Sequence, residues 1–443
     1  VANPSDMEIG HGIEALRPDS RLAHQASCHL GILYDSASRQ SLVAVNEEPG
    51  ASASIEMNGA DENNLKITFS KSFAGVTLDP NQTFQTASAT LLMANEDSPN
   101  QKLSAVLPDY FRYVLSRRMS EPRIVYCSGS AIKTDQNVLS LTPDAHFGGV
   151  LGFTTLCIQG GGFCRPGGFD VDLKAVPGGL GHAAKLLDER QMELGISIPL
   201  AALDPECAVA QEHPEWICRD KDGDMVTVEF EGEKRLMACL ASGYSAYLLE
   251  EIRKLYTRDN LRLVHLVGPC FHVPDGSIGP CHAAEHRHNG PAGVTIAIGR
   301  HLTSLLHNIA QQCPDLALGL DHDVLGNGDL DPSLLLVADF LRISRIPEQK
   351  DRRNHLEARR ILYRHAMRFP SERLVLGDMR LDGRNPVATV ATALGAFPLF
   401  TGSTSRLAPG QLDWMRGILD WYFALSRGIN FYERFYLLHG TED

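Results

Sequence analysis

The chain has 443 residues, of which 43% are hydrophobic and 21% charged, as is ordinary for a globular protein of two or three domains. Its 41 basic and 54 acidic residues give a formal charge of -13, which disfavours nucleic acid as a partner because phosphate backbones are also anionic. No run approaches the roughly 18 apolar residues that a membrane span requires, so we expect no membrane partner.

The first 120 residues predict an antiparallel β-sandwich. Short alternating segments separated by Asn, Asp, Gly and Pro are typical of strands joined by turns. These segments are residues 29–34, 41–45, 52–57, 65–69 and 88–93. A helical rhythm follows over residues 109–119 and ends at Pro122.

From Arg123 onward, short apolar strands alternate with helices, which indicates parallel βα units. The eight predicted strands are residues 124–127, 154–159, 193–199, 261–267, 316–320, 340–343, 374–376 and 396–400. The predicted helices include residues 179–190, 244–256, 294–312, 355–368 and 411–426. We therefore predict an α/β protein, with a sandwich over residues 1–120 and a (β/α)8 TIM barrel over residues 121–443.

Cofactor motifs are absent from the sequence. No GxGxxG follows a predicted strand, and the Gly160-Gly161-Gly162 run lacks the lysine of a phosphate-binding loop. We expect no cofactor. A homo-oligomer remains possible at this stage.

Ten cysteines without a CxxC pair are too sparse for a disulfide scaffold. We expect most of them to be buried free thiols, which favours a reducing compartment and hence the cytoplasm. Residues 1–20 lack the apolar segment of a secretory signal, although a secreted or periplasmic location stays open.

Several motifs occur in an order that resembles the α-galactosidase-like glycoside hydrolases, in particular family 36. They are Val-Pro-Gly-Gly-Leu at 176–180, His-Pro-Glu-Trp at 213–216, Arg-Phe-Pro at 368–370 and Leu-Gly-Asp-Met at 376–379. The resemblance runs over nearly the whole chain. It implies the sandwich-to-barrel order and a carbohydrate as substrate or ligand.

The chain departs from this family where the catalytic carboxylates would stand. The resemblance places the family's nucleophilic aspartate at Val267 and its acid/base at Arg345. The sugar-gripping Asp-Asp-Gly-Trp of the family is replaced after the second strand by a run that begins at Gln159. A retaining glycosidase needs two carboxyl groups about 5 to 5.5 Å apart. The chain is then either a glycosidase with a rearranged, non-standard set of catalytic residues or a catalytically inactive relative that binds carbohydrate.

Other polar residues follow the predicted strands, at the end of a barrel where function resides. Our catalytic candidates are Asp204, Asp321, Asp323 and His272. Asp204 could instead cap a turn, the acidic run after Asp321 could bind calcium, and a lone histidine could be structural.

Six further residues are candidates for substrate binding: Glu206, Trp216, His265, Arg345, Asp378 and Phe163. The aromatic rings would stack on sugar faces, with packing in the core as the alternative. Arg342 and Arg345 would suit a carboxylated sugar, because guanidinium and carboxylate pair in a bidentate fork.

The loop from Cys270 to His288 is rich in cysteine and histidine, the preferred ligands of zinc. Its spacings match no standard zinc motif. We therefore predict no metal site and no tightly bound zinc, with metal binding by this loop as the alternative.

Overall fold

The computed structural model describes most of the chain from residue 148 onward and a smaller part of the segment before it. The described residues are 24–26, 30–35, 40–47, 53–61, 64–71, 80, 83, 88–95, 106–115, 123–127, 148–159, 163–268, 270, 281–288, 290–321, 332–343, 352–366, 369–377, 379–383, 385–402, 404 and 407–428.

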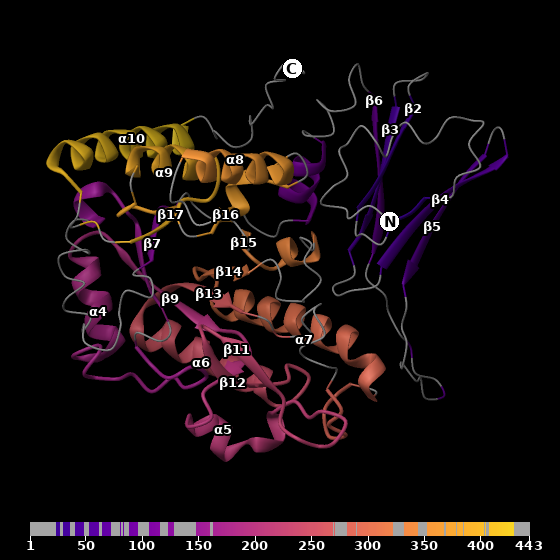
Figure 1. Cartoon of the computed structure of the whole chain (residues 1–443), viewed down its shortest axis with the longest axis horizontal. Helices are drawn as coiled ribbons and strands as arrows, with labels where there is room; N and C mark the ends of the chain where they lie inside the picture. Colours follow the sequence, from indigo (N-terminus) through magenta and orange to yellow (C-terminus); the bar gives the residue numbers. More distant parts are fainter. Residues whose placement is uncertain are drawn as a thin grey trace.

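The N-terminal strands form two three-stranded antiparallel sheets, which confirms the predicted antiparallel β-structure. One sheet has the order β1-β4-β5, from His24–Ala26, Ala53–Asp61 and Asn64–Lys71. The other has the order β2-β3-β6, from Leu30–Asp35, Gln40–Asn46 and Ala89–Asn95. Figure 1 shows these indigo strands beside the barrel.

A single π-helical segment, η2 (Tyr110–Leu115), joins the β2-β3-β6 sheet to the barrel. The Tyr110 hydroxyl donates to Glu47 Oε1 at 2.5 Å. On the other side, Arg112 Nε and Nη2 donate to the two carboxylate oxygens of Glu372 at 2.7 and 3.1 Å. The helical rhythm predicted for residues 109–119 is thus realised as a short π-helix whose side chains contact both neighbours.

Among the described residues, the later part of the chain contains a nine-stranded parallel sheet that closes almost completely, so the predicted TIM barrel is confirmed. Its order is β16-β15-β14-β13-β9-β8-β7-β18-β17. The strands are β7 Val125–Cys127, β8 Thr155–Gln159, β9 Glu193–Pro199, β13 Leu261–Val267, β14 Ala317–Asp321, β15 Phe340–Ile343, β16 Leu374–Leu376, β17 Met379–Arg380 and β18 Leu399–Thr401. All eight predicted strands are present, and β17 is an addition.

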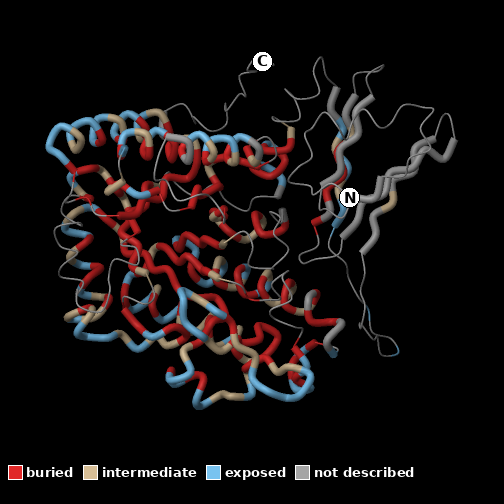
Figure 2. The backbone as a smooth tube through the Cα atoms, viewed as in Figure 1, coloured by how far each residue is buried: buried red, intermediate tan, exposed pale blue. Residues whose placement is uncertain are grey.

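Helices surround the barrel (Figure 1). They are α4 Gly179–Asp188, α6 Tyr244–Asp259, α7 Gly290–Gln312, α8 Arg352–Ala366, α9 Pro386–Ala393 and α10 Pro409–Gly428. The five predicted helices are confirmed, while α9 was missed although Asn385 caps it and Pro386 begins it. The central strands are buried, and exposed residues lie on the outer surface of the helices (Figure 2).

Apolar side chains fill the interior of the barrel. Phe340 and Phe397 stack with ring centroids 4.5 Å apart. Both belong to a cluster with Leu263 of β13 and Ala317 of β14. Gly319 is required beside them, because a Cβ there would lie 2.0 Å from the Phe340 ring. Since side chains alternate along a strand, Leu263, His265 and Val267 share the inward face of β13.

An insertion between β9 and α6 was not predicted. It contains α5 (Ala208–Glu212), the 3-10 turn η6 (Pro214–Trp216) and a small antiparallel sheet of order β10-β12-β11. These strands are β10 Ala202–Leu203, β11 Thr227–Phe230 and β12 Glu233–Met237. The described helices include none that is both long enough and apolar enough to cross a membrane.

Candidate functional site at the barrel mouth

Three neighbouring strands bring ionisable side chains together at the carboxyl end of the barrel. Asp321 ends β14 and pairs in register with Arg342 of β15. His265 of β13 lies opposite Gly319 in the pairing of β13 with β14. His265 Nε2 is 3.2 Å from Asp321 Oδ1, and Arg342 Nη1 is 3.7 Å from the same oxygen. The carboxylate of Asp321 therefore faces nitrogen atoms of two side chains and is largely buried.

The carboxylate of Asp321 is held in its ionised form. Burial acts to raise its pKa, but the contact with His265, the charge of Arg342 and the N–H of Gly268 outweigh burial and lower the pKa. The His265 contact lacks the direction of a good hydrogen bond, so we regard it as an electrostatic contact at short range. A group with a lowered pKa suits a nucleophile, an electrostatic stabiliser or a hydroxyl acceptor better than a general acid.

Asp321 also reaches the end of the neighbouring strand β13. Its Oδ2 accepts a hydrogen bond from the backbone N–H of Gly268 at 3.1 Å. Val267, just before this glycine, ends β13 and is buried. The carboxylate of Asp321, at the end of the fifth barrel strand, thus lies beside the end of the fourth strand. The fourth strand itself ends in Val267, which carries no carboxylate.

The tip of the β11–β12 hairpin approaches the same end of the barrel. The Phe230 ring packs so closely on Gly268 that a Cβ there would lie 2.6 Å from it. The next residue, Glu231, accepts a hydrogen bond from Gln159 Nε2 of β8 at 2.7 Å. Its positive φ of 54° forms the turn between the two strands. The sequence analysis missed both residues, because the hairpin strands are short and largely polar.

The two candidates after β9 are engaged in ion pairs. Asp204 binds Arg235 at 2.5 Å and accepts the backbone N–H of Glu206 at 2.8 Å. Glu206 itself is exposed and pairs with Arg165. The hydrogen bond from the Glu206 N–H corresponds to the turn-capping alternative for Asp204. The ion pair between Arg165 and Glu206 links the insertion to the segment after β8.

The two aromatic candidates lie in different environments. Phe163 is only 1% exposed within the main hydrophobic core, so its ring has no free face for a sugar and the stacking prediction is corrected to core packing. Trp216 is partly buried, stacks on His213 with centroids 3.8 Å apart, and packs against Gly243 at the start of α6. The candidates Asp323, His272, Arg345 and Asp378 lie outside the described residues.

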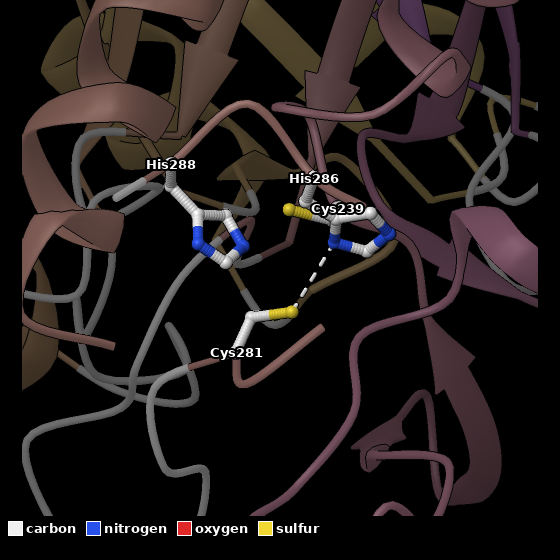
Figure 3. Close-up of side chains that lie close together, drawn as sticks. All are labelled: Cys239, Cys281, His286 and His288. Carbon is white, nitrogen blue, oxygen red and sulfur yellow. Dashed lines mark hydrogen bonds between the residues drawn. The ribbon is translucent and has the colours of Figure 1, made fainter. Parts of the chain in front are cut away.

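A second polar cluster lies between the insertion and the segment before α7. Cys239, Cys281, His286 and His288 each place a possible ligand atom within 4.8 Å of the others (Figure 3). His286 Nδ1 is 3.3 Å from Cys281 Sγ. A further buried thiol, Cys218, adjoins Cys239 and Cys281, and its hydrogen bonds to them raise its own pKa and lower that of Cys281. The nine described cysteines are all buried free thiols.

Comparison with solved structures shows which fold this is. An α-galactosidase of family 36 from Geobacillus stearothermophilus, AgaA in a variant form with stachyose, superposes with a TM-score of 0.76 over 93% of this chain and 59% of its own. The chain has the fold of the family 36 α-galactosidases. AgaB of the same organism gives 0.76, and the Lactobacillus brevis α-galactosidase gives 0.69 over 91% of this chain and 56% of its own.

The likeness to these α-galactosidases is one of fold. Sequence identity is 14% to AgaA, 16% to AgaB and 14% to the Lactobacillus brevis enzyme. The chain spans about three fifths of the length of the solved enzymes that it matches. No protein-family model and no curated protein matches the sequence.

Proposed function

We propose that the barrel mouth of this chain binds a carbohydrate, with Asp321 as the anchoring carboxylate. The supporting observation is the position of Asp321, an ionised and largely buried carboxylate at the end of a strand in an α-galactosidase fold. Sugar hydroxyls donate hydrogen bonds, and an ionised carboxylate accepts them about twice as strongly as a neutral group does. Ligands of TIM barrels bind at this end of the strands.

The neighbours of Asp321 complement such a ligand. Arg342 is partly exposed and can donate hydrogen bonds to ring or hydroxyl oxygens. Phe230, partly buried on the hairpin tip, offers an aromatic ring at the same end of the barrel. A uronic or sialic acid would gain an ion pair with the Arg342 guanidinium here, a role that the sequence suggests for Arg342 and Arg345.

Hydrolysis of a glycoside is the second candidate function. Two observations favour it: the carboxylate of Asp321 stands beside the end of β13, and the hairpin brings Glu231 over the same mouth. In this version Asp321 supplies the negative charge that stabilises an oxocarbenium-like transition state, and Glu231 supplies the acid. Asp204, Asp323 and His272 are further candidates for the second group. The usual α-galactosidase pair is not expected, because Val267 and Arg345 cannot act as carboxylates.

Calorimetric titration of the purified chain tests the proposal. The ligands are raffinose, stachyose, and glucuronic and galacturonic acids. We expect measurable binding of at least one of them, weakened about tenfold or more by Asp321→Asn, because hydrogen bonds to a charged group contribute about 1.5–3 kcal/mol. The matched control is Glu189→Gln, an exposed carboxylate near Arg190 at the end of α4, before β9 and therefore at the opposite end of the barrel, which leaves binding unchanged. Equal binding by both variants would overturn the role of Asp321.

A panel of aryl α- and β-glycosides, uronides included, separates the binder from the enzyme. Turnover that is lost in Asp321→Asn and retained in Glu189→Gln supports hydrolysis. Sugar binding without turnover of any member supports the catalytically inactive alternative. Robust turnover of an aryl α-galactoside that survives Asp321→Asn would contradict both versions.

A further inference from the structure

We propose that Cys239, Cys281, His286 and His288 bind one structural zinc ion. This reverses our prediction from the sequence, which weighed only the loop from Cys270 to His288 and expected no tightly bound zinc. The fourth ligand, Cys239, comes from the segment after β12, far away in the sequence. The inference does not depend on the proposed function of the barrel mouth.

The donor set is one that zinc prefers. Two thiolates and two imidazoles in tetrahedral geometry are typical of zinc, with Zn–S near 2.3 Å and Zn–N near 2.0–2.1 Å. Those bond lengths imply ligand–ligand distances of about 3.3–3.8 Å around a tetrahedron. The four ligand atoms lie within 4.8 Å of one another, and Figure 3 shows the four side chains converging. A small contraction would complete the coordination sphere.

The hydrogen bond of His286 sets its tautomer for metal binding. Its Nε2 lies 2.7 Å from the backbone carbonyl oxygen of Glu215. A carbonyl only accepts, so Nε2 carries the proton, and in the neutral ring the lone pair of Nδ1 points toward Cys281 Sγ at 3.3 Å. Metal-binding histidines characteristically donate their second ring N–H to a carbonyl or carboxylate in this way.

His288 provides an independent observation. The residue is only 7% exposed, and neither ring nitrogen has a hydrogen-bond partner among the described residues. Burying a polar group without a partner costs free energy, so such a histidine calls for an explanation. Its imidazole is directed at the two thiols (Figure 3), and a bound cation would accept the lone pair that nothing else satisfies.

The surroundings indicate a structural and not a catalytic ion. All four side chains are buried, with exposed fractions from 0% for Cys239 to 7% for His288. Four protein ligands fill a tetrahedron, whereas catalytic zinc keeps one position for water. Cys218 adjoins the two thiols but stands outside the group of four, so we assign it a hydrogen-bonding role.

The ion would fasten two segments at the carboxyl end of the barrel. One is the insertion that carries the β11–β12 hairpin, and the other is the segment before α7. Backbone hydrogen bonds already join them, from His282 N to Arg219 O and from Arg287 N to Ala241 O, both at 2.8 Å. Coordination to one zinc ion would add a further link between these two segments. Each coordinated thiol would release its proton when the ion binds.

Metal analysis tests the proposal on the whole chain. Protein expressed with added zinc is desalted, and its metal content is measured by inductively coupled plasma and native mass spectrometry. We expect about one zinc per chain, as for closed four-ligand sites. Cys281→Ser and His288→Ala should each lose most of the metal. Cys218→Ser and Cys313→Ser, which remove buried thiols outside the group, should keep it.

Cobalt substitution keeps the test decisive if a variant fails to fold. Wild-type protein loaded with Co²⁺ should show the absorption of a tetrahedral ion and charge-transfer bands of two thiolates. An octahedral spectrum, bands without thiolate character, or wild-type protein that takes up no zinc after reduction would each overturn the proposal. Loss of zinc in Cys218→Ser to the same extent as in Cys281→Ser would overturn the assigned ligand set.

Discussion

Asp321, the last residue of β14, accepts a hydrogen bond at 3.1 Å from the backbone N–H of Gly268, the first residue after β13. This contact places a charged carboxylate beside the end of a strand that carries no acid of its own. The same carboxylate faces His265 and Arg342.

We expect Asp321→Asn to lower the free energy of unfolding at pH 7 by about 1–3 kcal/mol, because a buried N–H, the Arg342 guanidinium and the His265 imidazole lose a charged partner. The folded-state pKa of Asp321 is depressed, so its contribution is present above the unfolded pKa of about 3.9 and is lost as the pH falls through the folded value. Urea denaturation from pH 7 to pH 3 should therefore show the two proteins converging in acid. A constant difference down to pH 3 would contradict this assignment.

Gly319→Ala should destabilise the barrel strongly. The added methyl group would meet the Phe340 ring at 2.0 Å, and overpacking of this kind costs about 1–3 kcal/mol or more. Gly417→Ala is the matched control: this glycine lies in α10 with nothing within 4 Å, so alanine should stabilise the helix by up to about 1 kcal/mol. Thermal unfolding of both variants checks the prediction, and adding Phe340→Leu should rescue only the first.

The contact between Arg112 and Glu372 should contribute measurably to stability. Both side chains are largely buried, at 3% and 10% exposure, and removing one partner of a buried pair costs about 3–5 kcal/mol. Arg112→Met and Glu372→Leu together should cost clearly less than the sum of the two single changes. The exposed pair Arg253–Glu250 serves as the control, with an expected coupling of about 0.3–0.5 kcal/mol in the same denaturation cycle.

Glu231 can be removed without disturbing the hairpin. Its φ of 54° is a conformation that glycine adopts freely, so Glu231→Gly should fold at least as stably as the parent. If the barrel mouth hydrolyses glycosides, this variant and Glu231→Gln should lose turnover while still binding sugar. Steady-state kinetics beside calorimetry measure the two properties separately, and unchanged kcat in both variants would exclude Glu231 as the acid.

The barrel could be predicted because its strands are buried on both sides. Such strands read as continuous apolar runs, and β9, β13, β15 and β16 begin and end where the sequence predicts. The β11–β12 hairpin lacked this signal, since residues such as Glu229 and Lys234 face solvent along both strands. A polar two-stranded element has no distinctive periodicity.

The sites were harder to predict than the fold. Asp321 could be predicted as a candidate because it stands at the carboxyl end of a barrel strand. Its contact with Gly268 could not, because that contact depends on how β13 and β14 pair. Asp204 follows β10 of the inserted sheet and not a barrel strand, and Arg235 of β12 engages it; the pairing of this sheet could not be foreseen. Cys239 was overlooked because nothing in its local sequence relates it to Cys281; only the packing of the insertion against the segment before α7 brings them together.

The stacked rings of Phe340 and Phe397 belong to the apolar cluster that fills the barrel interior. Among the described residues, buried side chains fill the barrel interior behind Asp321, so a polysaccharide cannot thread through it. A ligand at this end therefore enters and leaves the barrel on the same side.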